Sequence, residues 1–195
     1  MKTKIRLKVL LWISISLAMQ SLYAFAQGTF ANLNFESALV PDTPPQQGGQ
    51  VSPSLAFPGW VVIPGQDGLI LHNVTPIGSP SVVLLGPTWS QTDILEGNYT
   101  ADLYSAPINI GSAIAQIGQI PVTAQSMLFY AQVFNMSVSF AGNSLPFYQV
   151  GSGSNYGIFG VDMRALSGMT GELRFNALPL AGGGVGGVRL AACRT

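Results

Sequence analysis

Short alternating or apolar runs, each ended by glycine, proline or small polar residues, most strongly limit how this 195-residue chain can fold. Apolar and polar residues alternate in Met136–Phe140, in Glu172–Leu178 and in Tyr99–Tyr104. A period of two is typical of a β-strand with one face in a core and the other in water. No segment after residue 26 keeps a helical period. The sequence therefore predicts an all-β fold, an antiparallel β-sandwich.

Two further runs, Ser81–Leu85 and Met127–Val133, are apolar almost throughout. Such runs are typical of central strands that are covered on both faces. The segment Val40–Pro53 is rich in proline, which cannot donate to a strand ladder, so we expect a loop there rather than a strand.

Turn signals lie between the later runs. Gly142-Asn143 fits the two-residue loop of a type II′ hairpin after Met136–Phe140, because glycine holds the first position. One helical turn is predicted at Asp162–Ser167, with Asp162 as its cap and Gly168 at its end.

The first 26 residues have the three parts of a cleavable signal peptide. An apolar stretch, Val9–Met19, follows four basic residues, which are Lys2, Lys4, Arg6 and Lys8. Ala24-Phe25-Ala26 then supplies a small-x-small cleavage pattern, which makes Gln27 the first mature residue. An uncleaved anchor is the alternative, although the stretch is short for a span of about 20 residues. We therefore expect a secreted protein, extracellular or in the cell envelope, that meets a membrane only through this segment.

Charge separates the signal peptide from the rest of the chain. Beyond residue 26 there are four arginines, eight acidic residues and no lysine, which gives a net charge of −4. Nucleic-acid binding depends on lysine and arginine to neutralise phosphates, so we expect no nucleic-acid partner. The absence of lysine also excludes lysine bases and Schiff-base chemistry in the mature chain.

The predicted domain organisation has a signal peptide at 1–26, one β-sandwich domain at 27–178 and an atypical glycine-rich tail at 179–195. Within the tail, Val188–Ala192 is expected to form at most a last short edge strand. Cys193 is the only cysteine, so no internal disulfide can form. We expect Cys193 to lie in a frayed terminus, with intermolecular pairing as the alternative.

Five short motifs follow one another in an order that resembles bacterial exported jelly-roll proteins. They are Asn32-Leu33-Asn34-Phe35-Glu36, Pro58-Gly59-Trp60, Gly97-Asn98-Tyr99, Ile114–Pro121 and Gly171–Phe175. The pattern is similar to the short proteins that carry a PEP-CTERM sorting tail on a galactose-binding-like β-sandwich, over residues 29–178. The resemblance implies an extracellular, non-catalytic domain of a fold often used to bind glycans. Two parts of the pattern are missing after Leu178: the closing strand with its acidic residue, and the Pro-Glu-Pro sorting tail.

The same resemblance bears on calcium. In jelly rolls of this kind, a glutamate of the first strand often holds a structural calcium ion together with an acidic residue of the last strand. Glu36 matches the first position, and no residue matches the second. Calcium at Glu36 is therefore an expectation of the resemblance, with a surface or capping carboxylate as the alternative, and no other cofactor is expected.

Catalytic motifs are not found in the sequence. His72 is the only histidine and no Gly-x-Ser-x-Gly motif is present, so a hydrolase triad is not expected and His72 is assigned a structural role. Glycoside hydrolysis needs only two carboxylates, and Asp93, Glu96 and Asp102 are close in sequence, but surface acids are the simpler interpretation. The protein is therefore predicted not to be an enzyme, with an extracellular glycan hydrolase as the third-ranked alternative.

Aromatic residues with polar neighbours give the functional prediction, because sugars stack their C–H faces on rings while their hydroxyls need polar partners. Trp60 is expected in the core. Trp89 lies between polar residues, which favours an exposed platform, with core packing as the alternative. The predicted ligand-binding residues are Trp89, Tyr104, Asp102 and Tyr156, and the predicted partner is a polysaccharide or extracellular matrix. A structural or envelope assembly protein without a small-molecule ligand is the second hypothesis.

Overall fold

The computed structural model describes residues 29–64, 69–75, 81–106, 111–133, 135–182 and 184–194. The predicted signal peptide at 1–26 and its cleavage site lie outside these residues. Within them, no helix has the length and apolar character needed to cross a membrane.

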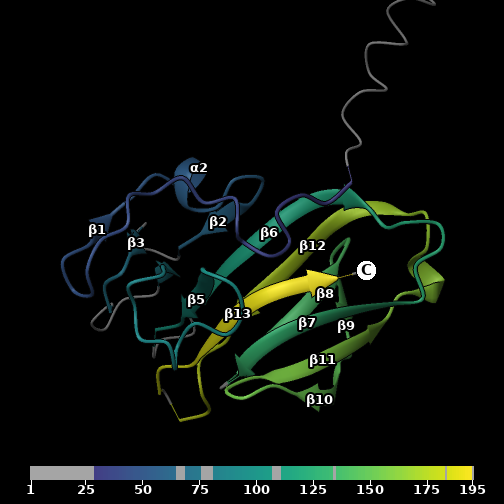
Figure 1. Cartoon of the computed structure of the whole chain (residues 1–195). Helices are drawn as coiled ribbons and strands as arrows, with labels where there is room; N and C mark the ends of the chain where they lie inside the picture. Colours follow the sequence, from purple (N-terminus) through teal and green to yellow (C-terminus); the bar gives the residue numbers. More distant parts are fainter. Residues whose placement is uncertain are drawn as a thin grey trace, which may run out of the picture.

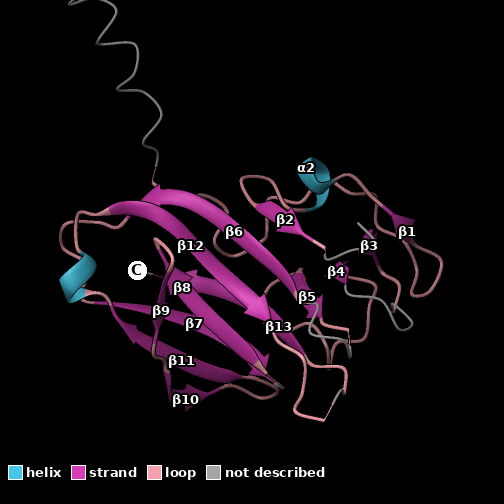
Figure 2. Cartoon of the chain, turned by 180° about the vertical axis from the view of Figure 1, so that it is seen from behind, coloured by secondary structure: helices cyan, strands magenta, loops and turns pink. Residues whose placement is uncertain are grey.

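Two β-sheets make up almost all of the regular structure (Figures 1 and 2). The order of strands in the larger sheet is β1-β3-β4-β5-β13-β7-β11-β10, and in the smaller sheet it is β2-β6-β12-β8-β9. Only β3 and β4 pair in parallel; the other paired strands of the described chain are antiparallel. The prediction of an all-β sandwich is confirmed.

The larger sheet contains β1 (Gly49–Gln50), β3 (Leu69–His72), β4 (Ser81–Leu85), β5 (Thr100–Tyr104), β7 (Ser126–Val133), β10 (Tyr148–Ser152), β11 (Gly157–Asp162) and β13 (Gly187–Arg194). The smaller sheet contains β2 (Val61–Ile63), β6 (Ser112–Gln119), β8 (Met136–Phe140), β9 (Asn143–Leu145) and β12 (Thr170–Ala177). Two helical turns join strands: α2 (Pro53–Ala56) and the 3₁₀ turn η2 (Arg164–Leu166).

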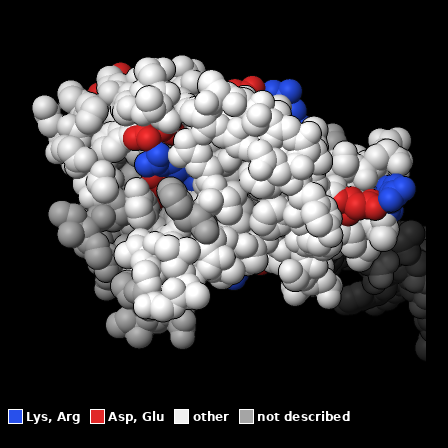
Figure 3. Space-filling model, turned by 90° about the horizontal axis from the view of Figure 1, so that it is seen from below, with Lys and Arg blue, Asp and Glu red and all other residues white. Residues whose placement is uncertain are grey.

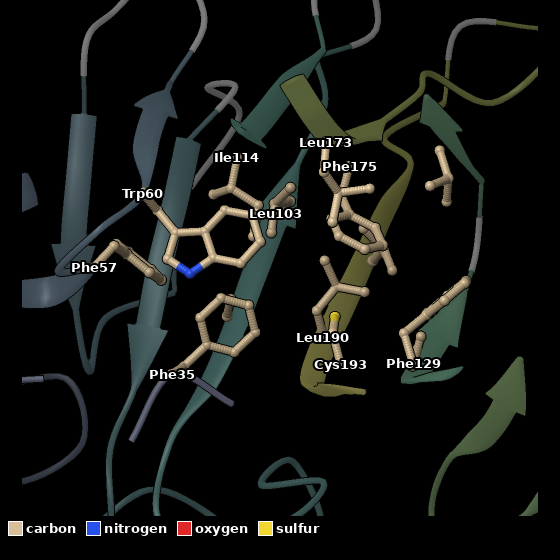
Figure 4. Packing of buried hydrophobic residues seen from close by; sticks show 14 of the residues in the cluster. Phe35, Phe57, Trp60, Leu103, Ile114, Phe129, Leu173, Phe175, Leu190 and Cys193 are labelled. Atoms are coloured by element: carbon tan, nitrogen blue, oxygen red, sulfur yellow. The ribbon is translucent and has the colours of Figure 1, made fainter. Parts of the chain in front are cut away.

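One apolar core lies between the sheets (Figure 4). Phe129 of β7 meets Phe175 of β12 edge to face, with ring centroids 5.4 Å apart, so the two sheets are joined by direct aromatic contact. Trp60 is buried beside Phe35, at 5.5 Å, as predicted for a core residue. Its Nε1 donates to the carbonyl of Asn32 at 2.9 Å, which satisfies the buried indole N–H.

The last strand corrects two predictions. β13 is not an edge strand: it lies between β5 and β7 and pairs with both (Figure 1). Val188, Leu190 and Cys193 point into the core, and Cys193 is 5% exposed rather than part of a frayed terminus. The segment predicted as an atypical tail therefore supplies a central strand. Glycine-rich spacing before Val188 hid the strand, because glycine weakens a strand pattern without forbidding one.

The hairpin between β8 and β9 is shifted by one residue from the prediction. Phe140 pairs with Asn143, so the loop residues are Ala141 and Gly142. Both have positive φ, at 49° and 80°. Positive φ at both positions is the requirement of a type I′ turn, whereas type II′ was predicted.

Smaller corrections concern three other segments. β1 gives the proline-rich segment a two-residue strand that was not expected. β4 is buried along its whole length, as predicted, but β7 alternates between buried and partly exposed residues and is not covered on both faces. The helical turn near Asp162 is present as η2, and Oδ1 of Asp162 accepts the N–H of Arg164 at 3.0 Å.

Candidate functional site

The candidate site lies on the outer face of the larger sheet, where β5, β13 and β7 run side by side. Val188 and Leu190 point into the core, so the residue between them, Arg189, points outward. The register places Arg189 opposite Asp102 on β5 and opposite Gln132 on β7. The two-residue period of three strands therefore gathers these polar side chains in one row.

Arg189 binds three side chains. Its Nε donates to Oδ2 of Asp102 at 3.0 Å, and its Nη1 donates to Oδ1 of Asp93 at 2.5 Å and to Oε1 of Gln132 at 3.1 Å. The side chain of Arg189 is 21% exposed and that of Asp102 is 5% exposed. We call Asp93, Asp102, Gln132 and Arg189 the Arg189 network. Its planar donor group is held in a single orientation because three acceptors from different segments fix it.

The network closes through the loop that joins β10 to β11. Nε2 of Gln132 donates to the carbonyl of Asn155 at 2.5 Å. The side chain of Asn155 in turn donates to the carbonyls of Thr92 and Ile94, at 2.9 and 3.0 Å. These carbonyls flank Asp93, which binds Arg189. The loop between β4 and β5 is therefore held on the sheet by both Asn155 and Arg189.

Burial controls the protonation of the network. Desolvation raises the pKa of Asp102 above its usual value, although Arg189 and the Tyr104 hydroxyl beside it act in the opposite direction. Tyr104 donates from its hydroxyl to Oδ2 of Asp102 at 3.0 Å. Burial, and then the charge of Asp102, raises the pKa of Tyr104. The phenol therefore stays a donor to Asp102 over the whole neutral range.

Trp89 is not a freely exposed platform. Its ring is half-buried and packs on a second apolar cluster outside the main core, made of Leu71, Val83, Leu85 and Ile94. Nε1 of Trp89 donates to Oδ2 of Asp93 at 3.0 Å. Trp89 therefore helps to hold Asp93 in the Arg189 network. Its ring contacts the second apolar cluster and its N–H is bonded to Asp93, so little of the side chain is left for a ligand.

A second pair of rings lies further along the same face. Tyr156, just before β11, stacks on Tyr130 of β7 with centroids 5.1 Å apart and planes inclined by 15°. The guanidinium of Arg194 lies 5.5 Å from the centroid of the Tyr130 ring, within the range of a cation–π contact. Among the described residues, neither tyrosine hydroxyl has a hydrogen-bond partner.

Two hollows adjoin these residues. A small one, of about 150 Å³, is lined by Asp102, Tyr104, Arg189 and the segment 185–187. A larger one, of about 400 Å³, is lined by Leu33, Glu36, Glu96 and Arg194, among others. Arg194 lines the larger hollow and lies over the Tyr130 ring, whereas the small hollow lies at the other end of β13, beside Gly187 and Arg189.

The residues around Glu36 do not fit calcium. Oε1 of Glu36 accepts the backbone N–H groups of Asn98 and Tyr99, at 2.9 and 3.1 Å, and Oε2 accepts the side-chain amide of Asn98 at 3.0 Å. Three N–H donors therefore already occupy the Glu36 carboxylate, whose oxygens would have to be free to bind a cation. The last strand, β13, contributes Arg194, which donates to Glu96, rather than an acidic residue. The described residues contain no group of three acidic, histidine or cysteine side chains able to hold a metal. Calcium prefers six to eight oxygen ligands, so Glu36 is better explained as a loop cap.

The three acids considered for glycoside hydrolysis are each paired with an arginine. Asp93 and Asp102 both bind Arg189, whereas Glu96 binds Arg194. His72 is buried, with Nδ1 and Nε2 at 2.9 and 3.1 Å from the carbonyl oxygens of Leu84 and Pro41, in agreement with its predicted structural role.

The structure brings the predicted site residues onto one face but changes their roles. Asp102 and Tyr104 are in direct contact, Trp89 reaches them through Asp93, and Tyr156 lies with Tyr130 beyond Gln132. Sequence reasoning missed Arg189, Gln132 and Asn155. Arg189 stands between two apolar residues, and this alternation was the available signal for an outward-facing residue of a strand.

Comparisons with known proteins find similarity to solved structures but not to a family model. No family model matches the chain, and no curated protein matches it, so the association with PEP-CTERM proteins has no support there. A solved structure of TmCBM61 in complex with β-1,4-galactotriose is similar to this chain, with a TM-score of 0.47 and 11% sequence identity. The match covers 86% of this chain and 97% of that one.

Proposed function

We propose that this protein is a secreted, non-catalytic module that binds a glycan on the outer face of its larger sheet. One observation carries the proposal: two tyrosine rings, whose hydroxyls make no hydrogen bond to the described residues, lie next to a fixed arginine–carboxylate group on a strand surface. Glycans combine apolar C–H faces with dense hydroxyls, so they need this combination of ring and oriented polar group.

Each part of the site has a separate task in this proposal. Tyr130 and Tyr156 offer ring edges and hydroxyls, and Arg194 lies over one of the rings. The Arg189 network keeps donors and acceptors in place before the ligand arrives, which lowers the entropy lost on binding. Nη2 of Arg189 makes no hydrogen bond to the described residues, so it remains a donor for a ligand hydroxyl in the small hollow beside it.

A non-catalytic role is favoured by the state of the acids. A glycosidase needs two carboxylates free to act on one bond, one as acid and one as base or nucleophile. Asp93 and Asp102 instead both bind Arg189. Carboxylates paired in this way hold the arginine in place and are not free to act as acid, base or nucleophile.

Affinity electrophoresis in gels containing β-1,4-galactan, a soluble β-1,4-glucan or a mannan tests the proposal. We expect at least one polysaccharide to retard the mature protein. Tyr156→Ala should lower that affinity about tenfold, since the ring edge and hydroxyl offered to the sugar are lost and Tyr130 loses its stacking partner. Tyr156→Phe should lower the affinity less than Tyr156→Ala, because the ring remains and only its hydroxyl is lost.

Ile117→Ala is the matched control, since Ile117 is exposed on the outer face of the smaller sheet and should not affect binding. Thermal unfolding of each variant separates loss of binding from loss of fold. Failure of every polysaccharide to retard a folded protein would reject glycan binding and favour an envelope assembly role.

Secretion is part of the proposal and has its own test. Expression of the full chain in a bacterium with a signal peptidase should yield a mature protein whose mass corresponds to a start at Gln27. An intact chain found in the cytosol would contradict export.

A further inference from the structure

We propose that the glycan bound at this site is uncharged, and that acidic polysaccharides are excluded by the way in which the protein pairs its own charges. This inference rests on the proposed function and specifies the ligand class of the same site.

Every arginine of the described chain is already paired with a carboxylate. The pairs are Arg164 with Asp162, Arg174 with Glu172, Arg189 with Asp93 and Asp102, and Arg194 with Glu96. No lysine occurs after Lys8. His72 is buried away from the site, so it cannot act as a surface cation. On the face shown in Figure 3, most of the charged residues accordingly lie in small groups that contain both signs, and the rest of that face is largely uncharged.

At the site itself, the carboxylates outnumber the arginines, so the formal charge is negative. Arg189 has one positive charge for two aspartates, and Arg194 is matched by Glu96. Glu36 adds a further carboxylate to the hollow that Glu96 and Arg194 line. A polyanion that approached either arginine would meet a carboxylate at nearly the same distance. At low salt the screening length is about 10 Å or more, so the carboxylate would repel it.

Uncharged sugars meet no such obstacle. A hydroxyl both donates and accepts, so it can bond the carboxylate and the guanidinium of one ion pair without separating them. Recognition of a carboxylate or sulfate instead needs an arginine or lysine whose charge is not already balanced by a neighbouring carboxylate. The described surface offers paired arginines only, which suits the uncharged ligand.

The experiment compares the binding of a neutral polysaccharide with the binding of two acidic ones. The neutral polysaccharide retained in the gel test is compared with the same polymer after oxidation of its C6 hydroxymethyl groups to carboxylates, and with polygalacturonate. We expect the acidic forms to bind at least about tenfold more weakly at about 20 mM NaCl. The difference should narrow at about 500 mM NaCl because salt screens the repulsion.

A charge variant makes the test specific. Glu96→Gln releases Arg194 at the site and should raise affinity for the oxidised polymer several-fold at low salt. Glu172→Gln is the matched control, because it releases Arg174 on the outer face of the other sheet and should leave that affinity unchanged.

The outcomes separate the two proposals. Tighter binding of an acidic form at low salt, weakened by added salt, would overturn the uncharged-ligand inference while glycan binding stood. An absence of binding to any polymer in the panel, neutral or acidic, would reject glycan binding and the inference with it.

Discussion

Arg189 shows how much a single residue determines in a chain that has so few charges. Its guanidinium holds a loop, through Asp93, and two strands, through Asp102 and Gln132. Breaking a buried ion pair by removing one partner leaves the other charge without compensation, so residues of this kind tolerate substitution poorly. Binding and stability therefore depend on the same side chain, and tests of function are better directed at Tyr156.

The reactivity of the Cys193 thiol tests whether this side chain is buried in the core. It is buried beside Phe129, and desolvation raises the pKa of its thiol to about 12. The thiolate is the reactive form, so the native protein should not react with a thiol reagent at neutral pH. Reaction should begin only on unfolding, as measured by absorbance of the released chromophore. Val185→Cys places a thiol at an exposed position of the same segment and should react at once.

Glu36 distinguishes a loop cap from a metal ligand. Its carboxylate accepts three N–H groups of the loop after Glu96, and a Cβ on Gly97 would overlap that carboxylate. Glu36→Gln should lower the free energy of unfolding by about 1–3 kcal/mol, since hydrogen bonds to a charged group are lost. Glu172→Gln, which breaks a partly exposed ion pair, should cost less than about 1 kcal/mol.

Calcium is the companion measurement for Glu36. Neither added calcium nor a chelator should shift the unfolding temperature if the carboxylate only caps the loop. A rise in unfolding temperature with calcium that Glu36→Gln abolishes would instead establish the metal site that the jelly-roll resemblance implies.

At the scale of elements, β13 decides whether the larger sheet is continuous. It joins β5 to β7, so without it that sheet would divide into two parts. Leu190→Ala should cost about 2–5 kcal/mol, as expected for a fully buried leucine. Val185→Ala, in the exposed glycine-rich stretch just before the strand, should cost less than about 0.5 kcal/mol. Equal effects in urea unfolding would mean that β13 is not a core strand.

The β8–β9 hairpin contains a residue that is poorly suited to its backbone. Ala141 has a φ of 49°, where a Cβ is unfavourable, while the next position is the flexible Gly142. Asparagine followed by glycine is the preferred type I′ pair, so Ala141→Asn should stabilise the protein by about 0.5–1 kcal/mol. Ser144→Asn on the adjoining strand is the control and should not stabilise it. A loss of stability in Ala141→Asn would argue against the positive-φ turn.

At the scale of the whole molecule, the two sheets share one core. Phe129 and Phe175 touch across it, and Trp60 lies among the same buried residues. Sheets that bury one common core should unfold together, because neither keeps its apolar face covered alone. Tryptophan fluorescence and far-ultraviolet circular dichroism should therefore give the same midpoint in urea. Two separate midpoints would show that the sheets unfold independently.

The sequence alone determined the all-β fold and the placement of Tyr104 and Asp102 on one face of a strand, because both depend on a local period of two. It also placed Trp60 in the core. It could not reveal the central place of β13 or the type I′ turn, since strand order and register are set by partners far away in the chain. The Arg189 network is likewise tertiary: Arg189 is far in sequence from Asp93, Asp102 and Gln132, and it meets them only after three strands pair. Local alternation specifies which residues face outward, whereas pairing between distant strands specifies which of them meet.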